Sequence, residues 1–421
     1  MTLKSGYQRI DIPLARSEEM LEVDGWAFSN TPQEATIENL QGVIDWDRAR
    51  GVEVTDAGIA EPGTLVACHS SHGYEMRVPG GGTVTTSGLT WVGVHSAHRR
   101  RGILTEMIDD HFTRALARGE VVSTLFAAET AIYQRFGYGL ACPNYRMSAG
   151  RAPGLREVPD SDDLRIDLEN ADVDKHGPII RELLARNTRP GTHATASDVQ
   201  IRDLFLDPEL WRDGAERLRF ACVRDANGPR AFATFVRKGS WEGGEPGGEM
   251  TVWTWLALDA AAERRLFSVI MDLDLLSKVK ARNIALDSPL VMLFDDIRGA
   301  HLTLQDNLWV RILDLPKALA ARAYAADADV TIEVFDKQLE ANNGLWRLRI
   351  AGGTAHASKE TSASVMPDVS ISMQDLSATY LGGVTFHQLA NAELIGGDAE
   401  AIAALSAAFA GTQLPVSAIA F

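Results

Sequence analysis

Three consecutive arginines, Arg99 to Arg101, stand directly before Gly102 in a turn that separates a predicted strand from a predicted helix. The strand spans residues 89–94, a short apolar run with one Trp and two Val residues, which is typical of a buried strand. After the turn, apolar residues recur on one helix face at Leu104, Met107, Ile108, Phe112 and Ala115. The first N–H groups of a helix are unpaired and its dipole favours an anion, so this basic turn predicts a phosphate site.

The spacing Arg99-x-x-Gly102-x-Leu104 resembles the acyl-CoA signature of the GNAT N-acetyltransferases, although that family normally has Gly or Ala where this chain has Leu104. No Gly-Lys-Ser/Thr follows and no GxGxxG is present, which excludes a Walker loop and a dinucleotide motif. The alternative for so short a match is an arginine-rich helix start in solvent. However, Ile132-Tyr-Gln-Arg-Phe-Gly-Tyr-Gly follows downstream, and this pairing resembles the Eis subgroup (enhanced intracellular survival acetyltransferases).

The resemblance implies a site for acetyl-CoA. By the family pattern, the backbone of residues 92–94 would line the pantetheine and present an N–H to the acetyl carbonyl, and residues 100–105 would hold the pyrophosphate. Arginine suits the second task because its planar guanidinium group can pair with two phosphate oxygens at once. The predicted cofactor-binding residues are Val92, Gly93, Val94, Arg99, Arg100, Arg101, Gly102, Ile103, Leu104, Thr105, Ala128 and Glu129.

Tyr133 is the predicted general acid, because the resemblance aligns it with the acid of the family. A phenol with a pKa of about 10 can protonate a departing thiolate whose thiol has a pKa of about 8.5. The alternative is that Tyr133 packs against the sheet as Phe136 is expected to do. Tyr138, after the turn, is predicted to be structural.

The general base is less obvious from the residues. Generic candidates are His69, His72, His95, His98 and His111. The chain sequence closes with the uncharged apolar segment Leu414–Phe421. Eis-type enzymes place the terminal carboxylate in the active site, so the resemblance implies that Phe421 supplies the base. An α-carboxyl group with a pKa of about 3.3–3.7 is a weak base for an ammonium, and the assignment therefore rests on the resemblance.

Residues 5–50 are expected to form helical pieces and loops, with helix starts at Ser17 and at Thr31-Pro32. The resemblance implies that such helices help to wall the acceptor pocket. Their aromatic and acidic side chains are candidates for binding an amine, and core packing or a solvated surface is the alternative for each. A further acidic candidate comes from the second half of the chain, where a surface loop is the alternative. The candidates are Trp26, Phe28, Trp46, Asp24, Asp45, Asp47, and Asp295 or Asp296.

The resemblance implies that the enzyme acetylates amines of aminoglycoside-like polycations and assembles as a homohexamer. Ala420 departs from the expected pattern, because an acidic residue there would help to bind a cationic acceptor. Two alternatives stay open: a protein lysine N-acetyltransferase, and a non-catalytic acetyl-CoA or lipid-binding scaffold. The intact Arg99–Gly102 turn and Tyr133 argue against the scaffold.

The resemblance covers the whole chain and implies a mixed α/β fold, with mixed sheets, of two tandem GNAT-like domains followed by a sterol-carrier-like domain. The expected units are an acetyl-CoA-binding domain at 1–150, a degenerate GNAT-like domain at 151–310 and the sterol-carrier-like domain at 311–421. The first unit is expected to be complete by residue 150.

Particular elements are expected within these units. In the first, residues 64–68 and 74–78 alternate as two antiparallel strands. In the second, a strand at 250–258 is followed by a helix over 261–280. The turn between them begins at Asp259, carries acidic residues and lacks glycine, so this second copy is not expected to hold the cofactor.

The formal net charge of −16 argues against general nucleic-acid binding, which needs a basic footprint, and favours polycationic substrates. The N-terminus does not resemble a signal peptide, and no apolar run approaches the roughly 20 residues that span a bilayer. The expected location is therefore the cytoplasm, with no membrane partner. Cys68, Cys142 and Cys222 are scattered, so buried thiols are expected and no metal site is predicted.

Overall fold

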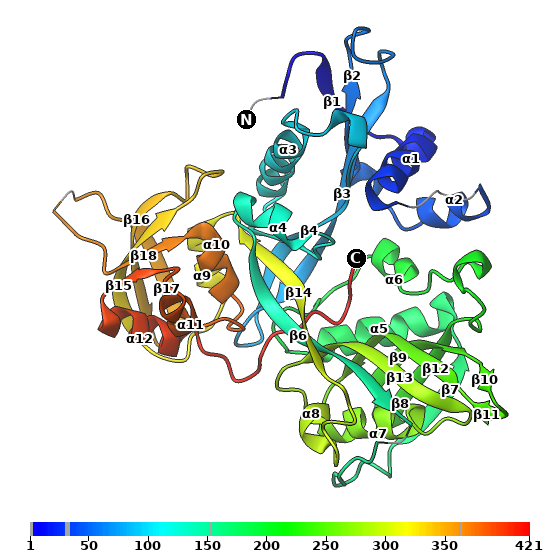
Figure 1. Cartoon of the computed structure of the whole chain (residues 1–421). Helices are drawn as coiled ribbons and strands as arrows, with labels where there is room; N and C mark the ends of the chain where they lie inside the picture. Colours follow the sequence, from blue (N-terminus) through cyan, green and yellow to red (C-terminus); the bar gives the residue numbers. More distant parts are fainter. Residues whose placement is uncertain (1–2, 30–33, 152, 363) are drawn as a thin grey trace.

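The computed structural model describes residues 3–29, 34–151, 153–362 and 364–421, which fold into three lobes in chain order (Figure 1). One mixed sheet of 12 strands runs through the first and second lobes, and a sheet of five strands forms the third. The predicted α/β fold with mixed sheets is confirmed. The expected helix start at Thr31-Pro32 lies outside the described residues.

Two parallel pairs, β4–β5 and β12–β13, interrupt an otherwise antiparallel arrangement of the large sheet. Each pair is joined by one helix, α3 in the first lobe and α7 in the second. In spatial order the strands are β1 (Tyr7–Asp11), β2 (Arg50–Val54), β3 (Leu65–Arg77), β4 (Thr83–Val94), β5 (Val122–Leu125), β14 (Thr303–Ile312), β6 (Gly139–Gly150), β13 (Leu276–Ala285), β12 (Gly248–Ala257), β9 (Gly228–Lys238), β8 (Arg219–Asp225) and β7 (Arg165–Asn170).

Helices cover both faces of the sheet in the first lobe. The apolar face of α3 packs through Ile103 and Met107 on Val52 and Val66, and α1 packs through Met20 on the other face, where Cys68 lies. The helices of the first two lobes are α1 (Ser17–Phe28), α2 (Glu34–Gln41), α3 (Ile103–Ala117), α4 (Thr130–Tyr133), α5 (Val173–Arg186), α6 (Asp198–Asp203), α7 (Ala260–Ile270) and α8 (Pro289–Leu293), with 3-10 turns at Leu14–Arg16, Trp46–Arg48, Ser96–His98, Gln134–Phe136 and Glu209–Trp211.

The third lobe packs helices against its five-stranded sheet, and its residues share one apolar core with part of the first lobe. A short hairpin, β10 (Trp241–Glu242) with β11 (Glu245–Pro246), projects from the second lobe. The third-lobe sheet has the order β17 (Thr354–Lys359), β16 (Gly344–Ala351), β15 (Ala328–Phe335), β18 (Val369–Ser372) and β19 (Gly396–Gly397), and its helices are α9 (Leu315–Ala321), α10 (Met373–Thr379), α11 (Phe386–Asn391) and α12 (Ala399–Phe409).

Two expected elements are wrong. Residues 65–68 and 74–77 belong to one long strand, β3, because β4 pairs with it from Ala67 to Arg77 across a bulge near His69. The helix expected over 261–280 ends at Ile270, and residues 276–280 begin β13. Buried and more exposed positions alternate over residues 279–283, which suits a strand once β12 is available as a parallel partner.

The first lobe does not complete its own sheet by residue 150, contrary to expectation. Strand β14 inserts between β5 and β6, although about 150 residues separate it from β6 in the sequence. Beyond β6 the sheet continues into β13 of the second lobe. The two lobes therefore share strands at a seam formed by β14, β6 and β13, and the boundaries near 150 and 310 stay predictions.

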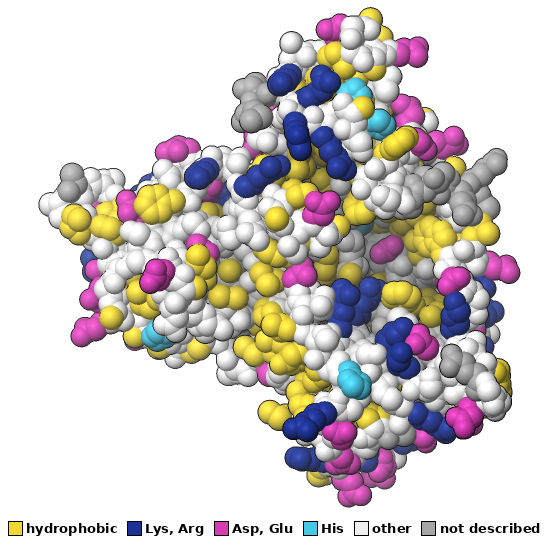
Figure 2. Space-filling view, in the orientation of Figure 1, with side chains coloured by type: hydrophobic (Ala, Val, Ile, Leu, Met, Phe, Trp, Pro, Cys, Tyr) yellow, Lys and Arg dark blue, Asp and Glu magenta, His cyan; other side chains and the backbone are white. Residues whose placement is uncertain are grey.

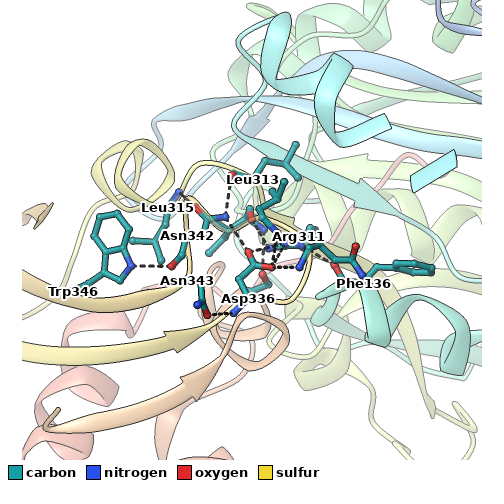
Figure 3. A network of polar contacts seen from close by, with 12 residues as sticks. Phe136, Arg311, Leu313, Leu315, Asp336, Asn342, Asn343 and Trp346 are labelled. Carbon is teal, nitrogen blue, oxygen red and sulfur yellow. Dashed lines mark hydrogen bonds and ion pairs between the residues drawn. The ribbon is translucent and has the colours of Figure 1, made fainter. Parts of the chain in front are cut away.

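A buried ion pair joins the third lobe to the first at this seam (Figure 3). Arg311 on β14 donates from Nη2 to both carboxylate oxygens of Asp336, at 2.7 and 2.8 Å. Its Nε donates to the carbonyl oxygen of Phe136 at 2.8 Å. Asn342 donates to the same carboxylate at 3.1 Å. Because Phe136 ends the helical segment that carries Tyr133, the third lobe supports that segment through Arg311.

Candidate active site

The site of interest opens where β4 and β5 separate. Only three residue pairs join these strands, from Thr86 opposite Val122 to Gly88 opposite Thr124. Beyond Gly88, β4 continues to Val94 without pairing with β5. Trp91 has a φ of 56° at a bulge in the β3–β4 pair, which bends the strand further. In this part of the described chain, main-chain groups of β4 that would have met β5 face a pocket instead.

This pocket has a volume of about 880 Å³. Figure 2 shows Lys and Arg side chains gathered over the part of the first lobe where α3 and α4 lie in Figure 1. The residues that line the pocket are Ala27, Phe28, Ser29, Val92, Val94, His98, Arg99, Arg100, Gly102, Ile103, Leu104, Thr105, Ala128, Glu129, Ile132, Tyr133 and Arg135. Every predicted cofactor residue except Gly93 and Arg101 is therefore on this wall.

The two exceptions have simple geometric reasons. Gly93 alternates with Val92 and Val94 along the pleat and points to the other face, where a Cβ would lie 3.4 Å from that of Ala27 on α1. Arg101 turns away from the pocket and holds its guanidinium 6.0 Å from the centre of the Tyr7 ring.

The turn before α3 presents an uncapped helix start to the pocket. Gly102 is the N-cap residue, with a φ of 82°, and it has no side chain to accept from the first-turn N–H groups. Arg100 also has a positive φ, of 62°. Successive N–H groups in such a turn form a concave site for an anion, and Arg99 and Arg100 line the same space.

A second pocket of about 340 Å³ adjoins the first and shares Phe28, Val92, Ala128 and Tyr133 with it. Most of its wall is apolar, and Asp24 contributes its acidic side chain. Its lining residues are Asp24, Phe28, Leu89, Thr90, Trp91, Val92, Leu125, Phe126, Ala128, Tyr133 and Phe421.

Tyr133 lies where the two pockets meet, at the end of α4. Its hydroxyl has no hydrogen-bond partner within the described part of the chain. Burial raises the pKa of Tyr133 to about 12, and nearby Glu129 adds to the shift. The phenol therefore keeps its proton at neutral pH. Tyr138 is different, because its hydroxyl is buried and lies 2.7 Å from Ser123 Oγ.

Phe421 comes to the second pocket from the other end of the chain. Its ring lies edge-on to Phe126, with centroids 5.2 Å apart, and 5.8–5.9 Å from the rings of His72, Tyr74 and His193. A Cβ at Gly88 would lie 2.6 Å from Phe421 Cζ, so only glycine on β4 leaves room for this ring.

Among the five predicted histidine candidates, only His98 lines the larger pocket, and none lines the smaller one. His69 and His111 are buried on the α3 face, where burial lowers the pKa of His69 to about 4 and that of His111 well below its usual value. His95 and His98 flank the start of α3, where His98 Nδ1 lies 3.0 Å from the Tyr7 hydroxyl. His72 packs beside Phe421, and burial lowers its pKa to about 4.

The acceptor candidates are divided by helix geometry. Asp24 and Phe28 are one turn apart on α1 and share the face toward the pocket, whereas Trp26 points away and is 55% exposed. Burial raises the pKa of Asp24 to about 6, and its carboxylate has no partner within the described residues. Asp295 lies in an exposed loop beside Gly154 in the second lobe, far along the chain from the pocket walls, and lines neither pocket.

The remaining candidates line neither pocket. Asp45 pairs with Arg48 at 3.5 Å beside the edge of the sheet, and Trp46 donates to the carbonyl oxygen of Gln41. Conversely, several residues that line the two pockets were not predicted from the sequence. Arg135 and Ile132 stand inside the motif around Tyr133, which could have indicated them, whereas Leu89, Trp91, Leu125 and Phe126 become wall residues only because β4 and β5 separate.

Comparisons with known proteins agree with this architecture. Residues 12–141 and 201–312 each match an acetyltransferase (GNAT) domain family, and residues 315–417 match the sterol carrier protein domain family. An uncharacterized N-acetyltransferase of Streptomyces avermitilis is 35% identical over 378 residues, 88% of this chain and 89% of that protein.

Two Eis proteins are also similar. N-acetyltransferase Eis of Mycobacterium tuberculosis is 28% identical over 362 residues, 81% of this chain and 82% of that protein. The crystal structure of Eis1 from Mycobacterium abscessus has a TM-score of 0.81 at 25% identity and covers 98% of this chain and 100% of that one. The chain therefore belongs to the Eis-like N-acetyltransferases of the GNAT superfamily.

Proposed function

We propose that this N-acetyltransferase binds acetyl-CoA in the larger pocket and transfers the acetyl group to an amine in the smaller one. The pyrophosphate would lie at the open start of α3, held by first-turn N–H groups and by Arg99 and Arg100. The pantetheine would run along β4 between Val92 and Ala128, in the gap left by β5. A main-chain N–H of β4 would then face the acetyl carbonyl and stabilise its developing negative charge.

The transfer itself needs two proton movements. The amine nitrogen attacks the thioester carbon, a C–N bond forms, and the C–S bond breaks as the tetrahedral intermediate collapses. The Phe421 carboxylate accepts the proton that the nitrogen loses, and the Tyr133 hydroxyl gives its proton to the departing sulfur. The products are the acetylated amine and free CoA thiol. Solvent then returns a proton to Tyr133 and takes up the proton held by the Phe421 carboxyl group, which resets the site.

One observation carries this proposal: Tyr133 and Phe421, nearly 300 residues apart in the sequence, line the same small pocket, which opens into the basic one. The apolar wall also favours the chemistry, because burial disfavours the charged ammonium form of the acceptor. Asp24, which is otherwise unpaired, would bind a second positive charge on the substrate. An acceptor with several amines, such as an aminoglycoside-like polycation, suits this arrangement.

The test measures release of CoA thiol from acetyl-CoA with and without an aminoglycoside, with product masses recorded. Mass increments of one or more acetyl groups support the proposal and count the amines that react. Acetyl-CoA binding without aminoglycoside turnover, followed by acetylation of a lysine peptide, would identify a protein lysine as the acceptor instead. Thiol release from neither substrate would overturn both. Light scattering of the same sample tests the proposed homohexamer.

A further inference from the structure

The second lobe repeats the diverging strands of the first lobe, but its gap is filled. Strands β12 and β13 pair in parallel only as far as Val252, although β12 continues to Ala257. Trp255 crosses the gap and donates from Nε1 to the carbonyl oxygen of Arg282 at 2.8 Å. A cavity of only about 40 Å³ remains there, and two of its lining residues, Val416 and Ala418, come from the C-terminal tail.

The tail is held here by its own main chain. Val416 N donates to the carbonyl oxygen of Pro190 at 3.0 Å, and Val416 O accepts from Thr192 Oγ1 at 3.1 Å. Two residues upstream, Leu414 N donates to Asp287 Oδ2 at 2.8 Å, and its carbonyl oxygen accepts from Arg189 at 2.7 Å. Main-chain hydrogen bonds of this kind supply the affinity when a protein binds an extended peptide.

Two buried asparagines continue this pattern at the seam between the lobes. Asn307 exchanges two hydrogen bonds with Ser417, accepting from its N–H at 2.7 Å and donating to its carbonyl oxygen at 3.2 Å. Asn283 donates to the carbonyl oxygen of Ala418 at 3.2 Å. Both asparagines stand where the pairing of β14 or β13 with β6 is interrupted, so their carboxamides are free to turn toward the tail.

Apolar packing complements these bonds. Ala418 and Ile419 are buried among Leu183, Phe220 and Leu256 in the core of the second lobe. Two residues later, Phe421 enters the first-lobe pocket. Figure 1 shows the tail passing behind β6 and β14 and ending between the two lobes. The tail is therefore anchored in the second lobe at Ile419, two residues before Phe421 reaches the smaller pocket of the first lobe.

We propose that the strand gap of the second lobe is a peptide-binding groove for residues 414–419, which holds Phe421 at the acceptor pocket of the first lobe. Asn283 and Asn307 are then positioning residues. In the first lobe the equivalent gap would bind pantetheine. In the degenerate second lobe it binds a peptide instead. The groove stands on its own contacts, whereas its catalytic consequence rests on the proposed role of the Phe421 carboxylate.

Release of Phe421 by carboxypeptidase A from the native full-length protein tests the groove without measuring catalysis. In the double variant Asn283→Ala/Asn307→Ala, release should accelerate at least about tenfold, because three hydrogen bonds to the tail are lost. The matched control is Asn144→Ala. Asn144 is equally buried and donates to Asn283 at 3.2 Å, but it makes no hydrogen bond to the tail. Equal release rates in the double variant and the control would overturn the proposal.

A second experiment adds the tail in trans. The protein lacking residues 414–421 should bind the labelled peptide Leu-Pro-Val-Ser-Ala-Ile-Ala-Phe saturably. The same peptide with Pro in place of Ser should bind at least about tenfold more weakly. Proline lacks the N–H that donates a hydrogen bond to Asn307 Oδ1 in the intact protein. Equal binding of the two peptides, or none by a folded protein, would overturn the groove. If the shortened protein does not fold, the carboxypeptidase rates decide.

Turnover with these peptides separates the groove from the proposed chemistry. The free-acid peptide should restore acetyl transfer to the shortened protein, whereas the amidated peptide should bind equally well and restore at most a small fraction of it. Binding of both peptides with equal restoration would keep the groove and reject the carboxylate as the base.

Discussion

The first and second lobes share one plan, a strand, a helix and a parallel strand that separates from the first, yet they present opposite surfaces at the helix start. In the first lobe, α3 begins at Gly102 without a side-chain cap and faces a pocket of about 880 Å³. In the second, Asp259 caps α7 by accepting from Ala262 N at 3.0 Å, and Arg230 donates to the same carboxylate at 3.1 Å.

A second carboxylate completes the difference. Glu263, in the first turn of α7, is buried and accepts from Leu290 N at 3.0 Å and from Ser288 Oγ. The positive end of the helix dipole is therefore already matched by carboxylates of the protein itself, and a phosphate would be repelled. This difference supports the proposal that only the first lobe binds an anionic cofactor, and the degeneracy of the second copy stays a prediction.

The largest expected effect comes from Tyr133. Among the described residues, no side chain of the second lobe lines either pocket, so none there can replace the Tyr133 hydroxyl. Tyr133→Phe keeps the ring and removes the proton donor, so kcat should fall by about 10²–10⁴-fold. The Kd for acetyl-CoA should stay unchanged. Steady-state rates and calorimetric binding check this, and a kcat within about threefold of the wild-type value would reject Tyr133 as the general acid.

Next in size is the link between the third lobe and the Tyr133 segment. Asp336→Ala leaves the Arg311 guanidinium buried without its counter-charge, which should lower the free energy of unfolding by about 3–5 kcal/mol. Denaturant unfolding measures this. Asp329→Ala is the control, because Asp329 pairs with Arg347 on an exposed surface and should lose less than about 1 kcal/mol. Similar losses of unfolding free energy in both variants would contradict the prediction that the buried Arg311–Asp336 pair stabilises the fold more than an exposed pair.

A smaller effect compares the two helix starts directly. Arg100→Ala removes one guanidinium from the open start of α3 and should raise the Kd for acetyl-CoA by about tenfold, since a hydrogen bond to a charged group contributes about 1.5 kcal/mol or more. Arg230→Ala, at the capped start of α7, should leave this Kd unchanged. If both variants bound equally weakly, the second lobe would also hold cofactor.

The smallest effect concerns the unpaired carboxylate of Asp24, in contrast to the bonded Glu263. Burial raises the pKa of Asp24 from 3.8 to about 6. The folded protein therefore loses stability as pH rises from about 4 to 6, where the unfolded chain is already ionised, and the loss is constant above 6. Asp24→Asn should raise Tm by a few degrees at pH 7.5 and have little effect at pH 4. A shift of equal size at both pH values would contradict the assignment.

Local patterns in the sequence were sufficient for much of the fold and the site. The apolar spacing after Gly102 predicted α3, because helix period and capping are properties of neighbouring residues. The basic turn pointed to residues that line the larger pocket, and their role in binding an anion stays a prediction. The motif around Tyr133 indicated the short helix that carries it. Gly93 and Arg101 do not line the larger pocket, although each is adjacent in the sequence to residues that do.

Only the tertiary structure decided how distant segments meet. Nothing local in residues 303–312 indicates that β14 enters the first-lobe sheet, since any exposed strand edge offers the same backbone groups. The lack of a charge partner for Asp24 among the described residues likewise depends on what packs around it. So do the hydrogen bonds that Asn283 and Asn307 make with the tail. The sequence by itself determined the chemistry available in each lobe. Long-range strand pairing and burial decided where Phe421 lies and which carboxylates stay unpaired, because both depend on contacts between residues far apart in the chain.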